Sequence, residues 1–312
     1  MDLRVTAAAA GVLGLAAVTE LVLRRRRPRT AHGRYANWIH PGGLLARPAQ
    51  ALANSRAARA MCELFPVPAM LSDVTDVVYV NYAVPAGRLQ PLVPAGLGLQ
   101  RVGPGGEWAV LTFLTYRHGH LGPALLGPLR RLLHSPVQTN WRIYVHDPHT
   151  GHAGVHFITT AINHFAYALG ARLLCEAMPM HLLHHAAVET VGDATVQLRL
   201  DPGHGSAPDA HALLTLTRRP SAGPWNPAFA TYEDMLKYVV HQDRALSVQP
   251  WHRWITRQEI QLDLTPEGCE SLAGPVRSES AQTLIGDAEP FSFYVRRVAF
   301  RFDSEQHDNL AG

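Results

Sequence analysis

The sequence predicts an α+β fold built around a large antiparallel β-sheet, either open or closed. Segments with the period-two alternation or the apolar continuity of strands are numerous in residues 70–302 and follow one another directly. Tight-turn residues join several of these segments, and only a few stretches carry apolar residues at helical spacing. Adjacent strands interrupted by few helices are typical of α+β proteins with antiparallel sheets.

An apolar stretch at residues 5–23 comes first along the chain. As a helix, its 19 residues would measure roughly 28 Å, about the thickness of a bilayer core. Glu20 lies one turn before the four arginines of residues 24–27, with which it can pair. Because positive charge stays on the cytoplasmic side, residues 1–27 are predicted to be a single-pass membrane anchor with a cytoplasmic body. A peripheral helix and a cleaved signal peptide are the alternatives.

Residues 28–69 form a predicted connector that is rich in proline and glycine at its start. Within it, residues 48–64 have the mixed apolar and charged pattern of one amphipathic helix. Residues 77–84 then have the composition of a strand, and residues 108–116 are apolar enough for a strand buried on both faces.

A polar row on one strand is the most informative feature of the chain. Asn140, Arg142 and Tyr144 alternate with Trp141 and other apolar residues, so the three polar side chains share one strand face. Such a face either meets solvent or lines a polar cavity, and the residues alone leave both readings open.

A hairpin and a helix follow that strand. Turn residues at 147–151 predict a tight loop to a second strand at 155–158. Helical spacing begins at residue 161, and Pro179 ends this helix. We expect the apolar face of the first strand to pack against the helix of residues 161–177.

The later elements follow from the same signals. Gly192 predicts a tight hairpin turn, and Thr231 followed by Asp234 resembles a helix capping box. The remaining predicted elements are strands at 182–190, 195–200, 212–217, 254–264 and 291–302, a helix through Tyr238, and a tail at 303–312.

Composition excludes several classes of function. The net charge is only +3, Lys237 is the only lysine, and no nucleic-acid-binding motif is present, so we predict no nucleic-acid partner. Three cysteines far apart indicate reduced thiols, with Cys175 as a core residue. The 18 histidines match no zinc spacing, and neither a nucleophile elbow nor a nucleotide-binding glycine pattern occurs, so no metal and no cofactor are predicted.

Three sequence runs carry a resemblance to a known family. NWRIYV at 140–145, GVHFITTAIN at 154–163 and the helix that ends at Pro179 are similar to the YqjF-like group of uncharacterised proteins in the acetoacetate decarboxylase-like superfamily. HQDRALSV at 241–248 adds to the match, which covers residues 70–265.

The resemblance implies a large antiparallel β-barrel or cone that encloses a pocket, but not the family's lysine chemistry. In acetoacetate decarboxylase, a Pro-Lys-Lys segment follows the helix, and its first lysine forms a Schiff base with the substrate. Here that segment is Pro179-Met180-His181. Met180 cannot form an imine, whereas His181 could act as an acid or base near neutral pH. Lys237 lies among Glu233 and Asp234, which raise its pKa instead of lowering it.

We therefore expect a domain that binds a small acidic or carbonyl-containing molecule, or an enzyme that works without an imine. Arg142 is the expected carboxylate anchor and Tyr144 a hydrogen-bonding partner. Asn140, Met180 and Tyr116 complete the predicted lining, with His181 as the candidate catalytic group. In the absence of a ligand, Glu107 or Glu176 would pair with Arg142. The alternative is a non-catalytic, membrane-tethered scaffold with a filled barrel, and homo-oligomerisation is left open.

Overall fold

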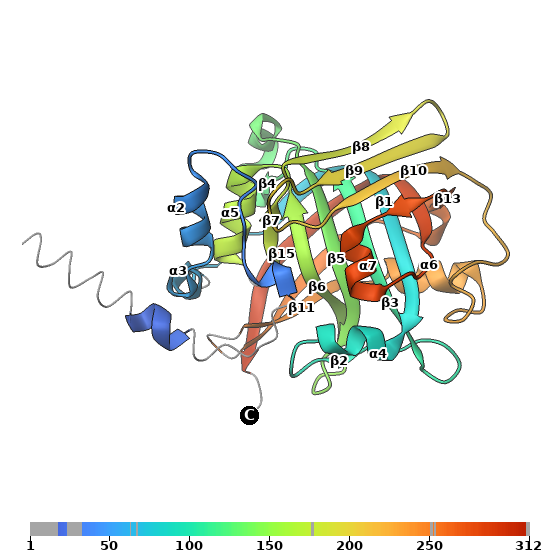
Figure 1. Ribbon diagram of the computed structural model, residues 1–312, viewed down its shortest axis with the longest axis horizontal. Helices are drawn as coiled ribbons and strands as arrows, with labels where there is room; N and C mark the ends of the chain where they lie inside the picture. The colour runs from blue at the N-terminus through green and yellow to red at the C-terminus, as the bar shows by residue number, and fades with distance from the viewer. Residues whose placement is uncertain are drawn as a thin grey trace, which may run out of the picture.

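The computed structural model describes residues 18–23, 33–62, 64–66, 68–175, 178–249, 252 and 254–309. The fifteen strands in the described residues join in one large sheet, with helices around it (Figure 1). The strands are β1 (Met70–Pro85), β2 (Gly98–Leu99), β3 (Trp108–Arg117), β4 (Gly122–Pro123), β5 (Val137–His146), β6 (Ala153–Ile162), β7 (Met180–Leu182), β8 (His185–Val191), β9 (Thr195–Asp201), β10 (Ala210–Leu216), β11 (Arg244–Gln249), β12 (Trp254–Leu262), β13 (Glu270–Ala273), β14 (Val276–Arg277) and β15 (Phe291–Asn309). The helices are α2 (Ala46–Ala53), α3 (Arg56–Cys62), α4 (Ala86–Leu89), α5 (Phe165–Leu174), α6 (Tyr232–Val240) and α7 (Glu279–Ile285), with 3₁₀ turns η1 (Gly33–Ala36), η2 (Gln90–Leu92), η3 (Ala124–Leu132) and η4 (Pro266–Gly268).

The strand pairings return to their starting point. The order β1-β3-β5-β6-β11-β12-β15 continues back to β1, because β15 pairs with both β12 and β1. Val78 of β1, for example, lies opposite Thr115 on one side and Tyr294 on the other. The prediction of a large antiparallel sheet holds for most pairings, but the sheet is mixed, since β6 pairs in parallel with β7 and with β11. A helix between β6 and β7 and a long excursion before β11 make these parallel pairings possible.

Three apolar clusters fill the fold. One lies on the face of the sheet covered by β8, β9 and β10, and includes Trp141, Ile143 and Leu198. A second lies on the opposite face, where α6 contributes Met235 and Leu236. A third joins α5 and α2. The expected packing of the apolar face of β5 against the helix after β6 was therefore wrong: strands β8–β10 cover it, and α5 lies further along the sheet. Alternation decided which side chains share a face, but only the tertiary fold decided what covers each face.

Local signals predicted several elements closely. Asp147 Oδ1 accepts a hydrogen bond from the His149 N–H at 2.9 Å, which closes the β5–β6 loop. Thr231 Oγ1 accepts from the Asp234 N–H at 3.1 Å and caps α6. Strand β3 is buried along almost its whole length, as its apolar composition predicts. These features hold because turn and cap chemistry acts between residues close in sequence.

Two predicted boundaries differ from the structure. The single helix expected at 48–64 is two helices, α2 and α3. Asn54 lies between them, and its side chain bonds both the N–H and the carbonyl of Trp38. Strand β15 extends through Asn309, so residues 303–309 belong to the sheet, where they pair with β12, and not to a tail.

The predicted anchor lies mostly outside the described residues, as do the arginines at 24–27. Residues 18–23 are helical, and Glu20 Oε2 accepts hydrogen bonds from the Ala57 N–H (3.0 Å) and the Ser55 hydroxyl (3.2 Å) at the start of α3. Among the described residues, no helix combines the length and the hydropathy needed to cross a bilayer.

Candidate functional site

The polar row of β5 lies inside the protein. Asn140, Arg142 and Tyr144 are at most 5% exposed, and Gln138 extends the same face by one more polar position. Of the two readings that the sequence left open, the structure therefore has the enclosed one. A polar face can be buried only if its groups find partners, so each side chain in the row needs a separate account.

Arg142 is held without a carboxylate. One guanidinium nitrogen donates to the carbonyl of Val239 at 3.0 Å, and the guanidinium carbon lies 5.7 Å from the Tyr79 ring centre and 5.6 Å from that of Tyr144. No acidic side chain in the described part of the chain forms an ion pair with it. The prediction of Glu107 as partner was wrong, because this side chain is exposed and bonds the Gly105 N–H, and Glu176 lies outside the described residues.

Helix α6 supplies the compensating electrostatics. Val239 stands in the last turn of α6, where unpaired carbonyls and the helix dipole favour a cation. Two aromatic faces add cation–π attraction. Burial lowers the pKa of Arg142, but its interactions with Tyr144 and Tyr79 outweigh this effect, and the net shift is upward. Burial also raises the pKa of Tyr79 to about 12 and that of Tyr116 above its usual range, so both phenols are neutral at pH 7. The row therefore carries one positive charge that no buried anion among the described residues balances.

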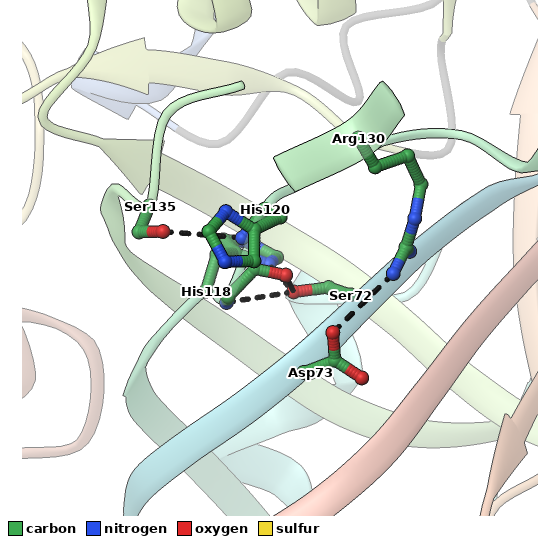
Figure 2. A network of polar contacts seen from close by, with 7 residues as sticks. Ser72, Asp73, His118, His120, Arg130 and Ser135 are labelled. Atoms are coloured by element: carbon green, nitrogen blue, oxygen red, sulfur yellow. Dashed lines mark hydrogen bonds and ion pairs between the residues drawn. The ribbon is translucent and has the colours of Figure 1, made fainter. Parts of the chain in front are cut away.

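A directional chain of hydrogen bonds runs from Tyr116 to Ser72. Asn140 donates to the Tyr116 hydroxyl at 3.0 Å, and Gln138 donates to Asn140 Oδ1 at 2.8 Å. His118 Nε2 lies 2.9 Å from Gln138 Oε1. Its Nδ1 lies 2.8 Å from Ser72 Oγ, as Figure 2 shows. With Gln138 Oε1 facing the ring, the Nε2–H of His118 donates to it, and Nδ1 faces the Ser72 hydroxyl.

Burial favours the neutral form of this imidazole. It lowers the pKa of His118 to about 4, against a weaker opposing effect of the Gln138 bond. Next to this interior group, Figure 2 shows the rim of the sheet, where Arg130 forms an ion pair with Asp73 at 3.3 Å.

Two cavities border the row. A small one of about 30 Å³ is lined by Tyr116, Asn140 and Arg142 and has room for roughly one water molecule. A larger pocket of about 230 Å³ lies under α5. Its wall is mainly apolar, with the polar side chains of His118 and Gln138 already paired to each other. Three residues line both cavities: Met178, Phe300 and Phe302.

The predicted site residues divide between these places. Asn140, Arg142 and Tyr116 meet at the small cavity, and the Tyr144 hydroxyl bonds Thr112 at 2.8 Å beside them. Met180 lines the larger pocket, where its sulfur accepts a bond from the Thr160 hydroxyl at 3.3 Å.

His181 lines neither cavity. Its neighbours Met180 and Leu182 pack with α5, whereas its own ring contacts Tyr35 and its Nδ1 lies 2.6 Å from the Ser206 hydroxyl. Alternation along β7 thus turns His181 away from Met180, and its acid/base role stays a prediction.

Lys237 does not belong to this buried polar row. It is exposed on α6 and forms an ion pair with Glu233 at 2.8 Å. The hydrogen bond and the charge of Glu233 raise the pKa of Lys237, as the sequence predicts. A raised pKa leaves less free amine for attack on a carbonyl.

Sequence reasoning missed His118, Gln138 and Val239. Gln138 could have been found by extending the period-two alternation of β5 by one step. His118 belongs to another strand end, and Val239 takes part through its backbone carbonyl, so no side-chain pattern marks either of them.

Comparison with known proteins identifies the family. Residues 72–273 match the DUF2071 family, described as "Uncharacterized conserved protein (COG2071)". The chain belongs to this family, which confirms the family resemblance noted in its sequence. No curated protein sequence matches the chain significantly.

Solved structures establish the fold class as acetoacetate decarboxylase-like. Acetoacetate decarboxylase from Legionella pneumophila is similar with a TM-score of 0.53 and 16% identity over 78% of this chain and 87% of that one. The enduracididine biosynthesis enzyme MppR with bound HEPES is similar with a TM-score of 0.52 and 15% identity, over 80% of this chain and 91% of that one. An acetoacetate decarboxylase-like enzyme from Sphingomonas wittichii RW1 is similar with a TM-score of 0.52 and 11% identity, over 78% of this chain and 94% of that one. At these identities the likeness concerns the fold alone.

Proposed function

We propose that the domain binds a small molecule with an apolar body and a carboxylate or carbonyl end. The apolar body occupies the pocket under α5, and the polar end points past Met178 toward Arg142. The observation that carries this proposal is the enclosed guanidinium of Arg142, which no carboxylate balances within the described chain and which lies next to an apolar pocket.

The size and lining of the pocket limit the ligand. Sites for drug-sized molecules measure about 300–1,000 Å³, and this pocket of about 230 Å³ is smaller. Its polar wall atoms are already paired, so the pocket itself favours hydrocarbon. The ligand's charge must then be met at Arg142, which binds carboxylates in a two-pronged geometry. Met178 and the two phenylalanines have to shift for this contact, and methionine is the side chain best suited to do so.

Binding of a series of linear carboxylates, followed by native mass spectrometry and calorimetry, tests the proposal. Arg142→Met should weaken binding at least about tenfold, the equivalent of about 1.4 kcal/mol, while thermal unfolding stays close to that of the wild type. Arg130→Met removes a rim arginine and serves as the matched control. Equal affinity in all three proteins would contradict the anchor role.

No Schiff base is part of this proposal. Met180 offers a thioether and Lys237, the only lysine, is exposed and paired. A reaction on the bound carbonyl would therefore have to proceed without a lysine imine.

A non-catalytic scaffold is the second candidate. It is favoured by the filling of the interior: Met235, Leu236 and Val239 of α6 are fully buried, and only about 30 Å³ remains beside Arg142. A scaffold should bind none of the carboxylates, and Arg142→Met should then leave it folded with nothing else changed.

Tethering through residues 1–27, with the body on the cytoplasmic side, also remains a proposal. An alkaline carbonate wash of membranes that contain the full chain tests it, since an integral anchor resists extraction. Release of the full chain into the supernatant would contradict it.

A further inference from the structure

Exposed apolar side chains gather at one end of the molecule. Among the described residues, every large apolar side chain that is strongly exposed belongs to helix 18–23, residues 39–65, η3 or α5, with the exceptions of Val191 and Leu213. Monomeric soluble proteins rarely expose large contiguous apolar patches without a use for them.

These segments lie next to one another. Helices α2 and α3 pack against α5 at the same end of the molecule (Figure 1). The residues that flank η3 contact α5 from both sides: Tyr167 donates to the Leu121 carbonyl at 2.8 Å, and the rings of His134 and His164 lie 4.3 Å apart. The Glu20 carboxylate fixes helix 18–23 to the start of α3. We call residues 33–62, 118–136 and 164–175 the apolar face.

The apolar face has a one-sided charge. Its three segments contain no aspartate and no glutamate, although Glu63 and Glu176 follow two of them directly in the sequence. Two carboxylates that contact the face are already bonded, Glu20 to the start of α3 and Asp73 to Arg130. The exposed charged side chains within the segments include Arg47 and Arg131. Apolar side chains interspersed with arginine are the composition of surfaces that bind the interface of anionic membranes.

Segment η3 carries three strongly exposed leucines. Leu125, Leu129 and Leu132 are 80%, 63% and 82% exposed, on two short turns separated by a kink at Gly127. Nothing in the fold of the described chain buries these leucines. Arg130 lies between them and is tied to Asp73 of β1, which fixes the segment to the sheet.

We infer that the apolar face lies on an anionic lipid bilayer and that the η3 leucines enter its interfacial region. Helix 18–23 contacts this same face through Glu20, so the end of the predicted tether and the folded body meet the membrane on one side. The same three segments of a second copy would bring arginine, and no aspartate or glutamate, to Arg131.

The pocket under α5 lies close to η3, so contact with a membrane bears on how a ligand enters it. This step rests on the proposed function. Pro68, Met70 and Leu121 line the pocket under α5, and Leu121 precedes the start of η3 by three residues. Met70 pairs with Pro123, and the Ala124 N–H donates to the Ala69 carbonyl at 2.7 Å. An apolar carboxylate dissolved in the bilayer would therefore reach the pocket beside η3.

Tryptophan quenching by brominated lipid tests the contact on the full chain. Leu129→Trp should lose fluorescence in anionic vesicles with brominated acyl chains, because interfacial side chains reach about 5–10 Å into the headgroup and acyl boundary. Leu213→Trp, which replaces an exposed leucine of β10 outside the face, should lose none beyond the wild-type background. Quenching should weaken in vesicles of zwitterionic lipid alone. Equal quenching of both variants, or quenching of neither, would overturn the inference.

A triple variant separates this inference from its alternatives. Leu125→Gln, Leu129→Gln and Leu132→Gln together should reduce partition of the full chain to anionic vesicles more than the pair Val191→Gln and Leu213→Gln does. Light scattering without lipid tests whether a second copy of the chain covers this face instead. Dissociation of a dimer by the triple variant would show a protein interface and contradict the inference. Carboxylate binding in solution should stay unchanged in the triple variant, so a failure of the proposed function is seen separately.

Discussion

The interior around Arg142 and the pocket under α5 share a wall but differ in almost every other respect. The interior is polar, hydrogen-bonded and nearly full, with α6 inserted against the β5 row. The pocket is apolar and has space, but its polar atoms are already paired. The charge that could recognise a ligand and the volume that could hold one therefore lie on opposite sides of Met178, Phe300 and Phe302. The comparison teaches that a binding residue and a binding cavity need not coincide, and that a movable wall between them decides whether they act together.

The largest effect should come from emptying the filled region. Leu236 of α6 is fully buried in the interior, so Leu236→Ala should lower the free energy of unfolding by about 2–5 kcal/mol. Leu174→Ala, at the edge of the pocket, removes a side chain that is already 36% exposed and should cost less than half as much. Urea denaturation of both variants measures the difference. Similar losses would mean that the two regions are equally well packed.

The second-largest effect should be a loss of folding stability in acid. The folded-state pKa of His118 is lowered to about 4, below its unfolded value of about 6.5, so the unfolded chain binds the proton first. Stability is therefore fully present above about pH 6.5 and is lost as the pH falls toward 4, by at most about 3 kcal/mol. Unfolding curves at several pH values, with His118→Gln as the non-titrating comparison, measure this loss. A slope that is the same in both proteins would assign the pH dependence to other groups.

A larger side chain in the wall of the pocket should raise stability instead of lowering it. Gly170 of α5 lines the pocket, and a Cβ there would meet no atom within 4 Å. Gly170→Ala should stabilise the protein by about 0.5–1 kcal/mol through helix propensity. Gly170→Leu should in addition occupy the pocket and abolish carboxylate binding.

Gly87→Leu in α4 provides the control, since it also has nothing within 4 Å but lines neither cavity. It should leave binding intact. Retained binding in Gly170→Leu would place the ligand elsewhere.

The smallest expected effect is none at all. Treatment with borohydride in the presence of acetoacetate should leave the intact mass unchanged, because Met180 cannot form an imine and Lys237 is held by Glu233. An adduct mapped by peptide mass spectrometry to Lys237 would restore lysine-based decarboxylation as the activity.

The sequence by itself determined the features that depend on neighbours in the chain. The β5 alternation, the Asp147 loop and the Thr231 cap follow from strand period and turn chemistry, and the resemblance carried by the residue 140–163 region predicted the fold family. The absence of a lysine at Met180 is likewise a matter of sequence. Such features need no knowledge of what lies across the sheet.

Only the tertiary structure decided the partners. Sequence placed Arg142 and Tyr144 on one face, but the choice between solvent and interior, and the choice of the Val239 carbonyl over a carboxylate, depend on where α6 docks. Met180 and His181 are adjacent in sequence, yet β7 turns one into the pocket and the other toward Ser206. Contacts between residues about a hundred positions apart are set by how whole elements bury their apolar faces, and a local pattern carries no information about that choice.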